Sequence, residues 1–219
     1  MFRECYVRAV PKAVRKPSPR DRARAARLEV YRQHVVDAAE QVFAEHGFEA
    51  AKLQDISKRA GLSMGTIYGV FPGKVELLQA ILDGRGRQML ALVESVVAEA
   101  GSPQESLQRL SEAYIDYFLE NRSFLLLHLR EGRAWTQAPT SGGSERAAIW
   151  SAIHDLQSSI FRRGIERGVV VDEDPSLLAK AFSARDQVGR ADWAANGMRQ
   201  SRNELVARLQ GLVARTFVR

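Results

Sequence analysis

The chain has 219 residues, 45% of them hydrophobic and 26% charged, and its 32 Lys and Arg against 26 Asp and Glu give a formal charge of +6. This composition is typical of a globular protein of one or two domains with a sizeable core. The longest apolar run, residues 124–129 with His128 included, is far shorter than the ~20 residues of a membrane-spanning helix. The basic N-terminus is not followed by the apolar stretch of a secretory signal. We therefore expect a cytoplasmic protein with no membrane partner.

The positive charge is concentrated at the N-terminus. Residues 1–27 hold nine Lys and Arg against two acidic residues, a net charge of +7, so the other 192 residues together carry −1. Three of the seven prolines and almost no apolar periodicity fall in this segment, which predicts a disordered basic arm rather than part of a core. Such an arm suits a polyanionic partner. A solubilising tail, or upstream codons read from a misplaced start, accounts for the same residues.

Beyond the arm, every periodic stretch has the helical period, with no alternating strand pattern and no long repeat. Gly47 is placed to stop the first helix, Ser63 to cap the third, and Ser102-Pro103-Gln104-Glu105 to open the fifth as a capping box. Residues 136–144 have the composition of a flexible loop. The sequence therefore predicts an all-α chain of about nine helices. The first predicted helix ends before residue 47, and the next three span 53–60, 64–71 and 74 to about 100. The fifth begins at 103, the sixth spans 123–135 and the seventh ends at about 168. The last two span 175 to about 196 and 201–217.

The second and third predicted helices are short and are joined by a Gly-Leu-Ser turn, which is the pattern of a helix-turn-helix. In this motif the first helix supports the second, whose N-terminal residues reach base edges in the major groove. Leu62, Ile67 and Phe71 can hold the third helix on its core. That arrangement leaves a polar and small-residue face to project outward. Plain core packing of the stretch SMGTIYGVF is the alternative interpretation.

The amino-acid sequence of this region is more specific evidence than its pattern of short helices. Residues 35–82, VVDAAEQVFAEHGFEAAKLQDISKRAGLSMGTIYGVFPGKVELLQAIL, resemble the N-terminal domain of the tetracycline-repressor (TetR) family. Members of that family typically read I-L-x-A-A-x-x-L-F-x-x-x-G-F, then T-x-x-x-I-A-x-x-A-G-V-S-x-G-T-L-Y-x-Y-F, then a lysine that opens the fourth helix. The match runs over about 48 residues in register and without gaps.

The resemblance implies a sequence-specific DNA-binding transcriptional regulator, ordinarily a ligand-responsive repressor that binds a palindromic operator as a homodimer and needs no cofactor. It divides the chain into the arm (1–27), a three-helix DNA-binding domain (28–82) and a larger helical bundle (83–219) for ligand binding and dimerisation. Thr66 and Tyr68 can contact phosphate, sugar or a thymine methyl, and Lys74 lies at a helix N-terminus that favours phosphate. The expected DNA-binding residues are Lys52, Gln54, Ser63, Met64, Gly65, Thr66, Tyr68, Gly69 and Lys74.

Several positions depart from the family pattern. Ala51 and Lys52 stand where threonine is frequent, Met64 where a basic or small polar residue is frequent, and Gly69 where histidine or another polar residue is common. Each helical glycine costs roughly 1 kcal/mol relative to alanine, which suggests close backbone approach to DNA or a helix that firms up on binding. Residues 28–82 carry five basic and seven acidic residues, so phosphate attraction has to come from local placement and from the arm.

The bundle is larger than support of a helix-turn-helix requires, which implies a second task. By the resemblance, that task is to bind a small-molecule effector in the core and to dimerise through the last two helices. Ordinary core packing is the alternative for each aromatic residue. The candidate pocket residues are Tyr114, Tyr117, Phe118, Phe124, His128, Trp135 and Trp150. The candidate dimer-face residues are Phe182, Trp193, Leu205, Leu209 and Leu212.

Other classes of function find little in the sequence. There is no Gly-rich phosphate loop, no G-x-S-x-G, no H-E-x-x-H and no Cys/His cluster, so an enzyme is not expected. The single Cys5 excludes an intramolecular disulfide, and His128 with Glu131 is one isolated pair, so no metal site is predicted. A helical-bundle adaptor, or an activator without small-molecule control, is the alternative to a ligand-responsive repressor.

Overall fold

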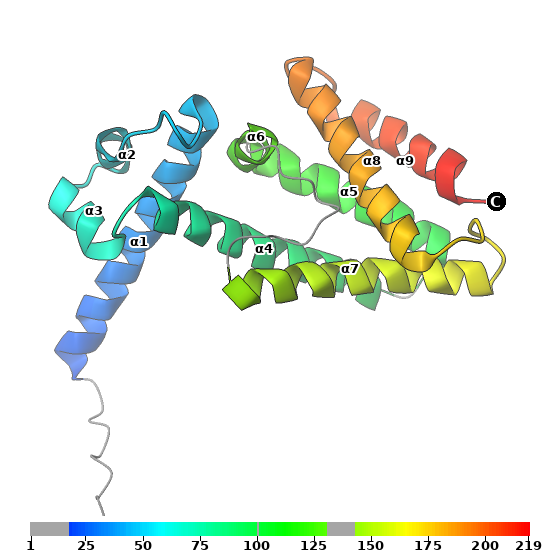
Figure 1. The fold of residues 1–219 in the computed structure, drawn as a ribbon, viewed down its shortest axis with the longest axis horizontal. Coiled ribbons are helices and arrows are strands. Elements are labelled where there is room, and N and C mark those ends of the chain that lie inside the picture. The colour runs from blue at the N-terminus through cyan, green and yellow to red at the C-terminus, as the bar shows by residue number, and fades with distance from the viewer. Residues whose placement is uncertain (1–17, 100, 131–142) are drawn as a thin grey trace, which may run out of the picture.

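A computed structural model describes residues 18–99, 101–130 and 143–219. Over these ranges the chain forms nine α-helices and no strand, as the sequence predicts (Figure 1). None of the described helices is both long enough and apolar enough to cross a membrane. The helices are α1 (Pro19–His46), α2 (Leu53–Ala60), α3 (Met64–Val70), α4 (Lys74–Ala98), α5 (Pro103–Glu120), α6 (Arg122–Arg130), α7 (Gly143–Glu166), α8 (Pro175–Ala195) and α9 (Arg202–Phe217).

The prediction of a disordered arm is wrong for residues 18–27, which begin α1. The hydroxyl of Ser18 accepts a hydrogen bond from the Asp21 amide, and the Asp21 carboxylate accepts one from the Ser18 amide at 3.0 Å, forming a capping box. Pro19 occupies the first turn, where its missing N–H costs nothing, and the Arg and Ala residues that follow favour helix. Residues 1–17 lie outside the described range. Every residue from 18 to 30 is exposed, so this half of α1 projects away from the other helices (Figure 1).

Helices α1 to α3 and the start of α4 share one small core. Val35, Val42 and Phe43 of α1 are buried against Ile56 of α2 and Ile67 of α3. Gly47 stops α1 with φ of 78°, in the region that glycine adopts without strain, as its position in the sequence predicts. The chain then turns back through Phe48, whose ring meets Phe43 edge-on at 5.4 Å. This core fixes the orientation of the two short helices that follow.

Helices α4 to α9 form the larger bundle. Helix α4 packs against α7, α7 against α8, and α5 against α9, while α6 lies against α1 and so closes the space between the two halves. An antiparallel bridge between Val218, near the C-terminus, and Val170 holds the end of the chain against the segment that follows α7. Figure 1 shows α4 running from the N-terminal domain into this bundle. The two halves therefore share a helix rather than a linker.

The predicted dimer-face side chains are core residues of a single chain. Phe182, Trp193, Leu205 and Leu209 are at most 1% exposed, and Leu212 is half-buried against the same cluster. The inner faces of α8 and α9 carry these residues because the helices must first cover α7 and α5. The identification of these side chains as a dimer face is therefore corrected. The large apolar residues that α8 exposes are Leu177 and Val188.

Candidate nucleic-acid interface and bundle cavity

The turn between α2 and α3 is held by its own backbone and by Ser57. Gly61 adopts the left-handed conformation, with φ of 65° and ψ of 27°, and its amide donates to the Lys58 carbonyl. The Ser57 hydroxyl donates to the Leu62 carbonyl at 2.6 Å, while the Leu62 amide returns a bond to the Ser57 carbonyl. The glycine was identified from the sequence, but the role of Ser57 was not. A serine inside an amphipathic helix gives no signal of a bond across a turn.

Helix α3 begins at a capped residue and buries one side. The Ser63 hydroxyl accepts a hydrogen bond from the Thr66 amide at 3.1 Å. Ile67 is fully buried, whereas Tyr68, the next residue, is 56% exposed. These are the orientations that the sequence leads us to expect. Met64 and Thr66 are half-buried at the helix start, and Gly65 and Gly69 are exposed.

The two glycines of α3 are not required by packing inside the chain. A Cβ at Gly69 would meet nothing within 4 Å, and one at Gly65 would meet only the Ser63 hydroxyl at 3.8 Å. Neither residue has a positive φ. The chain therefore carries the helix-propensity cost of both glycines without an internal reason for it. Their faces offer an unobstructed approach to the backbone of α3.

An arginine of α1 fixes the end of α3. Arg32 donates to the Val70 carbonyl at 3.3 Å, and its guanidinium lies 4.2 Å from the centre of the Phe71 ring. The bond satisfies a carbonyl that the helix end leaves open, and the ring contact adds a cation–π interaction. Arg32 was not among the predicted site residues. Nothing local in the sequence links it to a helix 38 positions later.

Lys74 occupies a different place from the one predicted. Its ammonium donates to the carbonyls of Phe48 and Glu49, at 2.8 and 3.0 Å, and lies 4.9 Å from the Phe48 ring. These bonds tie the start of α4 to the turn after α1. Two of the three ammonium hydrogens therefore serve the fold, and the phosphate contact of Lys74 stays a prediction. Lys74 thus holds the start of α4 in place and is half-buried.

The acidic residues of the N-terminal domain are partly neutralised by arginine. Arg59 makes a two-pronged contact with Glu45, at 2.5 and 2.7 Å, and these hydrogen bonds lower the pKa of Glu45 below its usual range. Glu40 is buried and paired with Arg85. Lys52 and Gln54, at the start of α2, are exposed, and Lys52 caps the helix without a side-chain hydrogen bond. Arg85 lies outside residues 28–82, so its pairing with Glu40 compensates one acidic charge of this domain.

Two partly buried ion pairs join α4 to its neighbours. Arg85 donates to both oxygens of Glu40, at 2.8 and 2.7 Å, and also contacts Asn121. Two residues earlier in α4, the Asp83 carboxylate accepts two hydrogen bonds from Arg146 of α7, at 2.8 and 2.7 Å. The first pair connects α4 with α1 and the second connects α4 with the bundle. Neither was predicted from the sequence.

A cavity of about 50 Å³ lies between α4, α5, α7 and α8. Of the predicted pocket residues, Tyr114, Phe118 and Trp150 line it. The others do not belong to it: Tyr117, Phe124 and His128 are buried in the layer that α5 and α6 form toward α1, and Trp135 lies outside the described residues. The described residues that line the cavity are Met89, Tyr114, Phe118, Trp150, Ile153, His154, Gln157, Lys180, Ser183 and Arg190.

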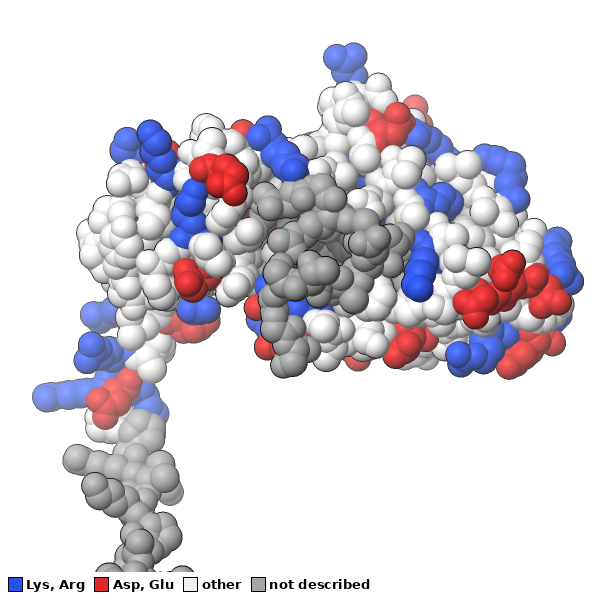
Figure 2. Space-filling view, viewed as in Figure 1, with Lys and Arg blue, Asp and Glu red and all other residues white. Residues whose placement is uncertain are grey.

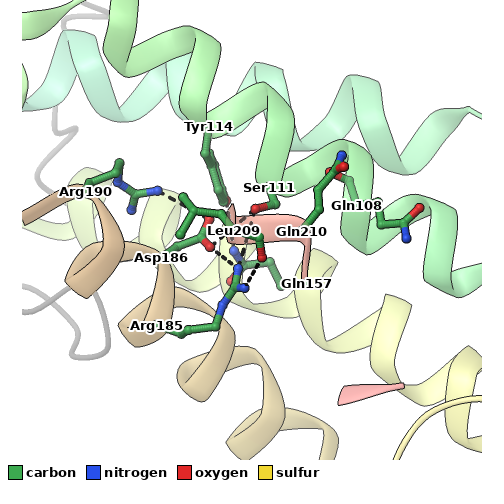
Figure 3. Close-up of polar contacts among 9 residues, drawn as sticks. All are labelled: Gln108, Ser111, Tyr114, Gln157, Arg185, Asp186, Arg190, Leu209 and Gln210. Atoms are coloured by element: carbon green, nitrogen blue, oxygen red, sulfur yellow. Dashed lines mark hydrogen bonds and ion pairs between the residues drawn. The ribbon is translucent and has the colours of Figure 1, made fainter. Parts of the chain in front are cut away.

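Beside the cavity lies a buried ionic cluster that the sequence reading missed. Asp186 is fully buried between Arg185 and Arg190, and the Arg190 guanidinium approaches it at 3.3 Å (Figure 3). Burial raises the pKa of Asp186, and the two guanidinium groups act against that rise. Arg185 also donates to the Leu209 carbonyl at 2.6 Å, which links α8 to α9. The available signal was three charged residues on the otherwise apolar inner face of α8.

The described residues contain no group of three His, Cys, Asp or Glu side chains that could hold a metal ion. Glu131, one half of the isolated pair in the sequence, lies outside them.

Comparisons with known proteins agree with this geometry. A family model described as "Bacterial regulatory proteins, tetR family" matches residues 35–81. The A-factor receptor protein of Streptomyces griseus is 30% identical over 178 residues, which cover 78% of this chain and 59% of that protein. The HTH-type transcriptional repressor SCO4008 of Streptomyces coelicolor is 27% identical over 194 residues, or 83% of this chain and 95% of the relative.

A solved structure of the transcriptional regulator FadR from Bacillus subtilis, in complex with stearoyl-CoA, has the same fold. The TM-score is 0.68 at 20% identity, over 83% of this chain and 96% of that one. The chain covers only 30–59% of the length of four curated relatives, the A-factor receptor protein among them.

The ionic cluster makes a prediction about stability. Asp186→Asn keeps the shape of the side chain but leaves two buried guanidinium groups without their carboxylate, so we expect a loss of about 3–5 kcal/mol in the free energy of unfolding. Asp192→Asn on the same helix is the control: Asp192 pairs with Arg208 while 47% exposed, and we expect a loss below about 1 kcal/mol. Urea denaturation measures both. Equal, small losses would show that the cluster is not a buried ionic contact.

Proposed function

Because the chain belongs to the tetR family of bacterial regulatory proteins, we propose that it represses transcription by binding an operator in double-stranded DNA and releases it when an effector occupies the bundle. The observation that carries the proposal is the division of α3. Ile67 anchors the helix in the core while Tyr68, beside it, points into solvent next to two glycines with open space around them. A helix that is packed against the core on one face and exposed on the other is suited to binding in the major groove.

On this proposal, contacts to the duplex come from three places. The first turns of α3 present Ser63, Met64, Thr66 and Tyr68 to base edges and sugars, and Gly65 and Gly69 let the backbone come close. Lys52 and Gln54, exposed at the start of α2, contact phosphate on one flank. The projecting half of α1, where Figure 2 shows basic side chains gathered, supplies further phosphate contacts. Its exposed arginines are Arg20, Arg22, Arg24 and Arg27.

We propose that the operator is a palindrome read by a homodimer. Two recognition helices about 34 Å apart place one in each of two successive major grooves. The inner faces of α8 and α9 are used within one chain, so the dimer contact is assigned to their outer faces. Val188, which is 67% exposed on α8, is the most solvent-exposed large apolar residue among the described ones and lies on such a face.

The effector is assigned to the cavity between α4, α5, α7 and α8. The names of two similar proteins support ligand control: one is a receptor for A-factor, and the other was solved with stearoyl-CoA. Met89 of α4 lines the cavity, and α4 also carries Lys74 and Leu77 into the N-terminal domain. A ligand that displaces α4 therefore changes the placement of α3, which loosens the grip on DNA.

The direct test begins with selection of duplexes from a random pool, which should enrich an inverted repeat. Tyr68→Ala should weaken binding to the enriched duplex at least tenfold, since it removes one exposed side chain of the reading face. Tyr68→Phe should retain most of the affinity if the ring matters more than the hydroxyl. Fluorescence anisotropy measures the dissociation constants, and unchanged thermal unfolding shows that both variants fold. No enriched sequence, or wild-type affinity in Tyr68→Ala, would contradict the proposed site.

The projecting half of α1 gives a separate prediction about affinity. Replacement of Arg20, Arg22, Arg24 and Arg27 by Gln keeps helix propensity and removes four charges per chain, or eight per homodimer, so it should reduce the slope of log affinity against log salt by about 7 if all of them contact phosphate. The control replaces four arginines of the bundle by Gln and should leave the slope unchanged. These are Arg162, Arg163, Arg167 and Arg215. Equal slopes for all three proteins would show that the α1 extension does not touch DNA.

A further inference from the structure

Helix α3 carries no charged or amide side chain. Its residues, Met64–Val70, include no Arg, Lys, Asn, Gln, Asp or Glu. In the major groove, Arg and Lys distinguish guanine, Asn and Gln distinguish adenine, and Asp and Glu accept from cytosine. Lys52 and Gln54 are exposed at the start of α2, where the proposed function assigns them to phosphate. Discrimination between bases by α3 therefore has to come from other chemistry.

The hydroxyl groups at the start of α3 discriminate poorly between bases. Ser63 Oγ and Thr66 Oγ1 lie 2.9 Å apart and share one hydroxyl hydrogen, and Ser63 Oγ also accepts from the Thr66 amide. One hydroxyl hydrogen of this pair is thus left for the duplex. A single hydroxyl can donate to acceptors on guanine, adenine or thymine alike. The same limit applies to the hydroxyl of Tyr68.

The exposed side of α3 does offer apolar surface. Met64 and Tyr68 are four residues apart, so their side chains are neighbours on one side of the helix. Tyr68 is 56% exposed, and Met64 is half-buried at the helix start. Gly69, beside Tyr68, leaves open space, because a Cβ there would meet nothing within 4 Å. The surface that α3 presents is thus a thioether chain and an aromatic ring with room next to them.

From this composition we propose that the protein recognises its operator through the C5-methyl groups of thymine. Among the four bases, only thymine displays a methyl group in the major groove. The thioether chain of Met64 and the ring of Tyr68 pack against these methyl groups, and the contact removes apolar surface from water. This inference rests on the proposed function, which brings α3 into the major groove, and it adds which base α3 reads there.

The test compares the enriched duplex with a copy in which deoxyuridine replaces every thymine of the two half-sites. Deoxyuridine lacks the methyl group and keeps the O4 acceptor of thymine, so only the apolar contact is lost. Fluorescence anisotropy on the full chain should show at least tenfold weaker binding of the deoxyuridine duplex. A duplex with deoxyuridine only outside the half-sites controls for changes in DNA flexibility, and it should bind as the unmodified duplex does.

Protein variants assign this loss to the named side chains. In Met64→Ala and in Tyr68→Ala, the deoxyuridine penalty should fall at least threefold, because one of the two apolar contacts is already absent. Alanine favours helix at both positions, and unchanged thermal unfolding checks that the variants fold. Leu177→Ala removes an apolar side chain of α8 that is 53% exposed. It is the matched control and should keep the full penalty.

Three results would overturn the inference: enriched half-sites without thymine, equal binding of the thymine and deoxyuridine duplexes, or a penalty undiminished in both Met64→Ala and Tyr68→Ala. A penalty reduced in only one variant assigns the methyl contact to that side chain. An enriched duplex that binds equally well with deoxyuridine contradicts only the reading of thymine. Failure to enrich any duplex contradicts the proposed function as well.

Discussion

Helix α4 is one continuous helix that packs against α1 near its start and against α5 and α7 further along, and the rest of the molecule depends on that constraint. Its first turns carry Leu77, Leu78 and Ile81 into the N-terminal domain, and its later turns carry Met89 and Val93 into the bundle. At 1.5 Å per residue its 25 residues span about 37 Å. Because a helix does not bend freely without a break in its hydrogen bonds, the two halves cannot reorient independently. The glycines in its middle, Gly84 and Gly86, lie inside unbroken helix.

Two ion pairs of α4 also hold the N-terminal helices and the bundle together. Glu40 with Arg85 fixes α4 to α1, and Asp83 with Arg146 fixes it to α7, within one turn of each other. Breaking either pair would leave a charge buried and unpaired, which is far more costly than losing a surface contact. The two pairs therefore connect α7 through α4 to α1. Because α4 both lines the small cavity and packs against α1, the cavity is structurally connected to the N-terminal helices.

The sequence predicted the helices and the motif well, because these depend on local chemistry. The stop at Gly47, the caps at Ser63 and Ser102 and the buried side of α3 all follow from short-range rules. The same rules applied to Ser18 and Asp21 would have found the true start of α1. The charge and proline content of the N-terminus favours disorder, whereas the capping box of Ser18 and Asp21 marks a helix start.

The errors and omissions concern contacts between segments far apart in the chain. Apolar periodicity in α8 and α9 marks the face that is buried, but it does not tell whether a partner chain or the same chain covers it. The bonds from Lys74 to the carbonyls of Phe48 and Glu49 join residues about 25 positions apart, so no local pattern predicts them. Asp186 and its two arginines all lie on α8, but their burial depends on the packing of α5 and α9, which contribute Ser111 and the Leu209 carbonyl. Such contacts are set by packing, which no single segment encodes.

Hydrogen exchange measured by mass spectrometry, with and without the enriched duplex, tests the central claim most directly. If α3 reads DNA and α4 joins the two cores, bound DNA should slow amide exchange in residues 52–70 and 19–34. A smaller slowing should extend along α4 and stop short of α9. Protection confined to the bundle, or no change in residues 52–70, would contradict the account.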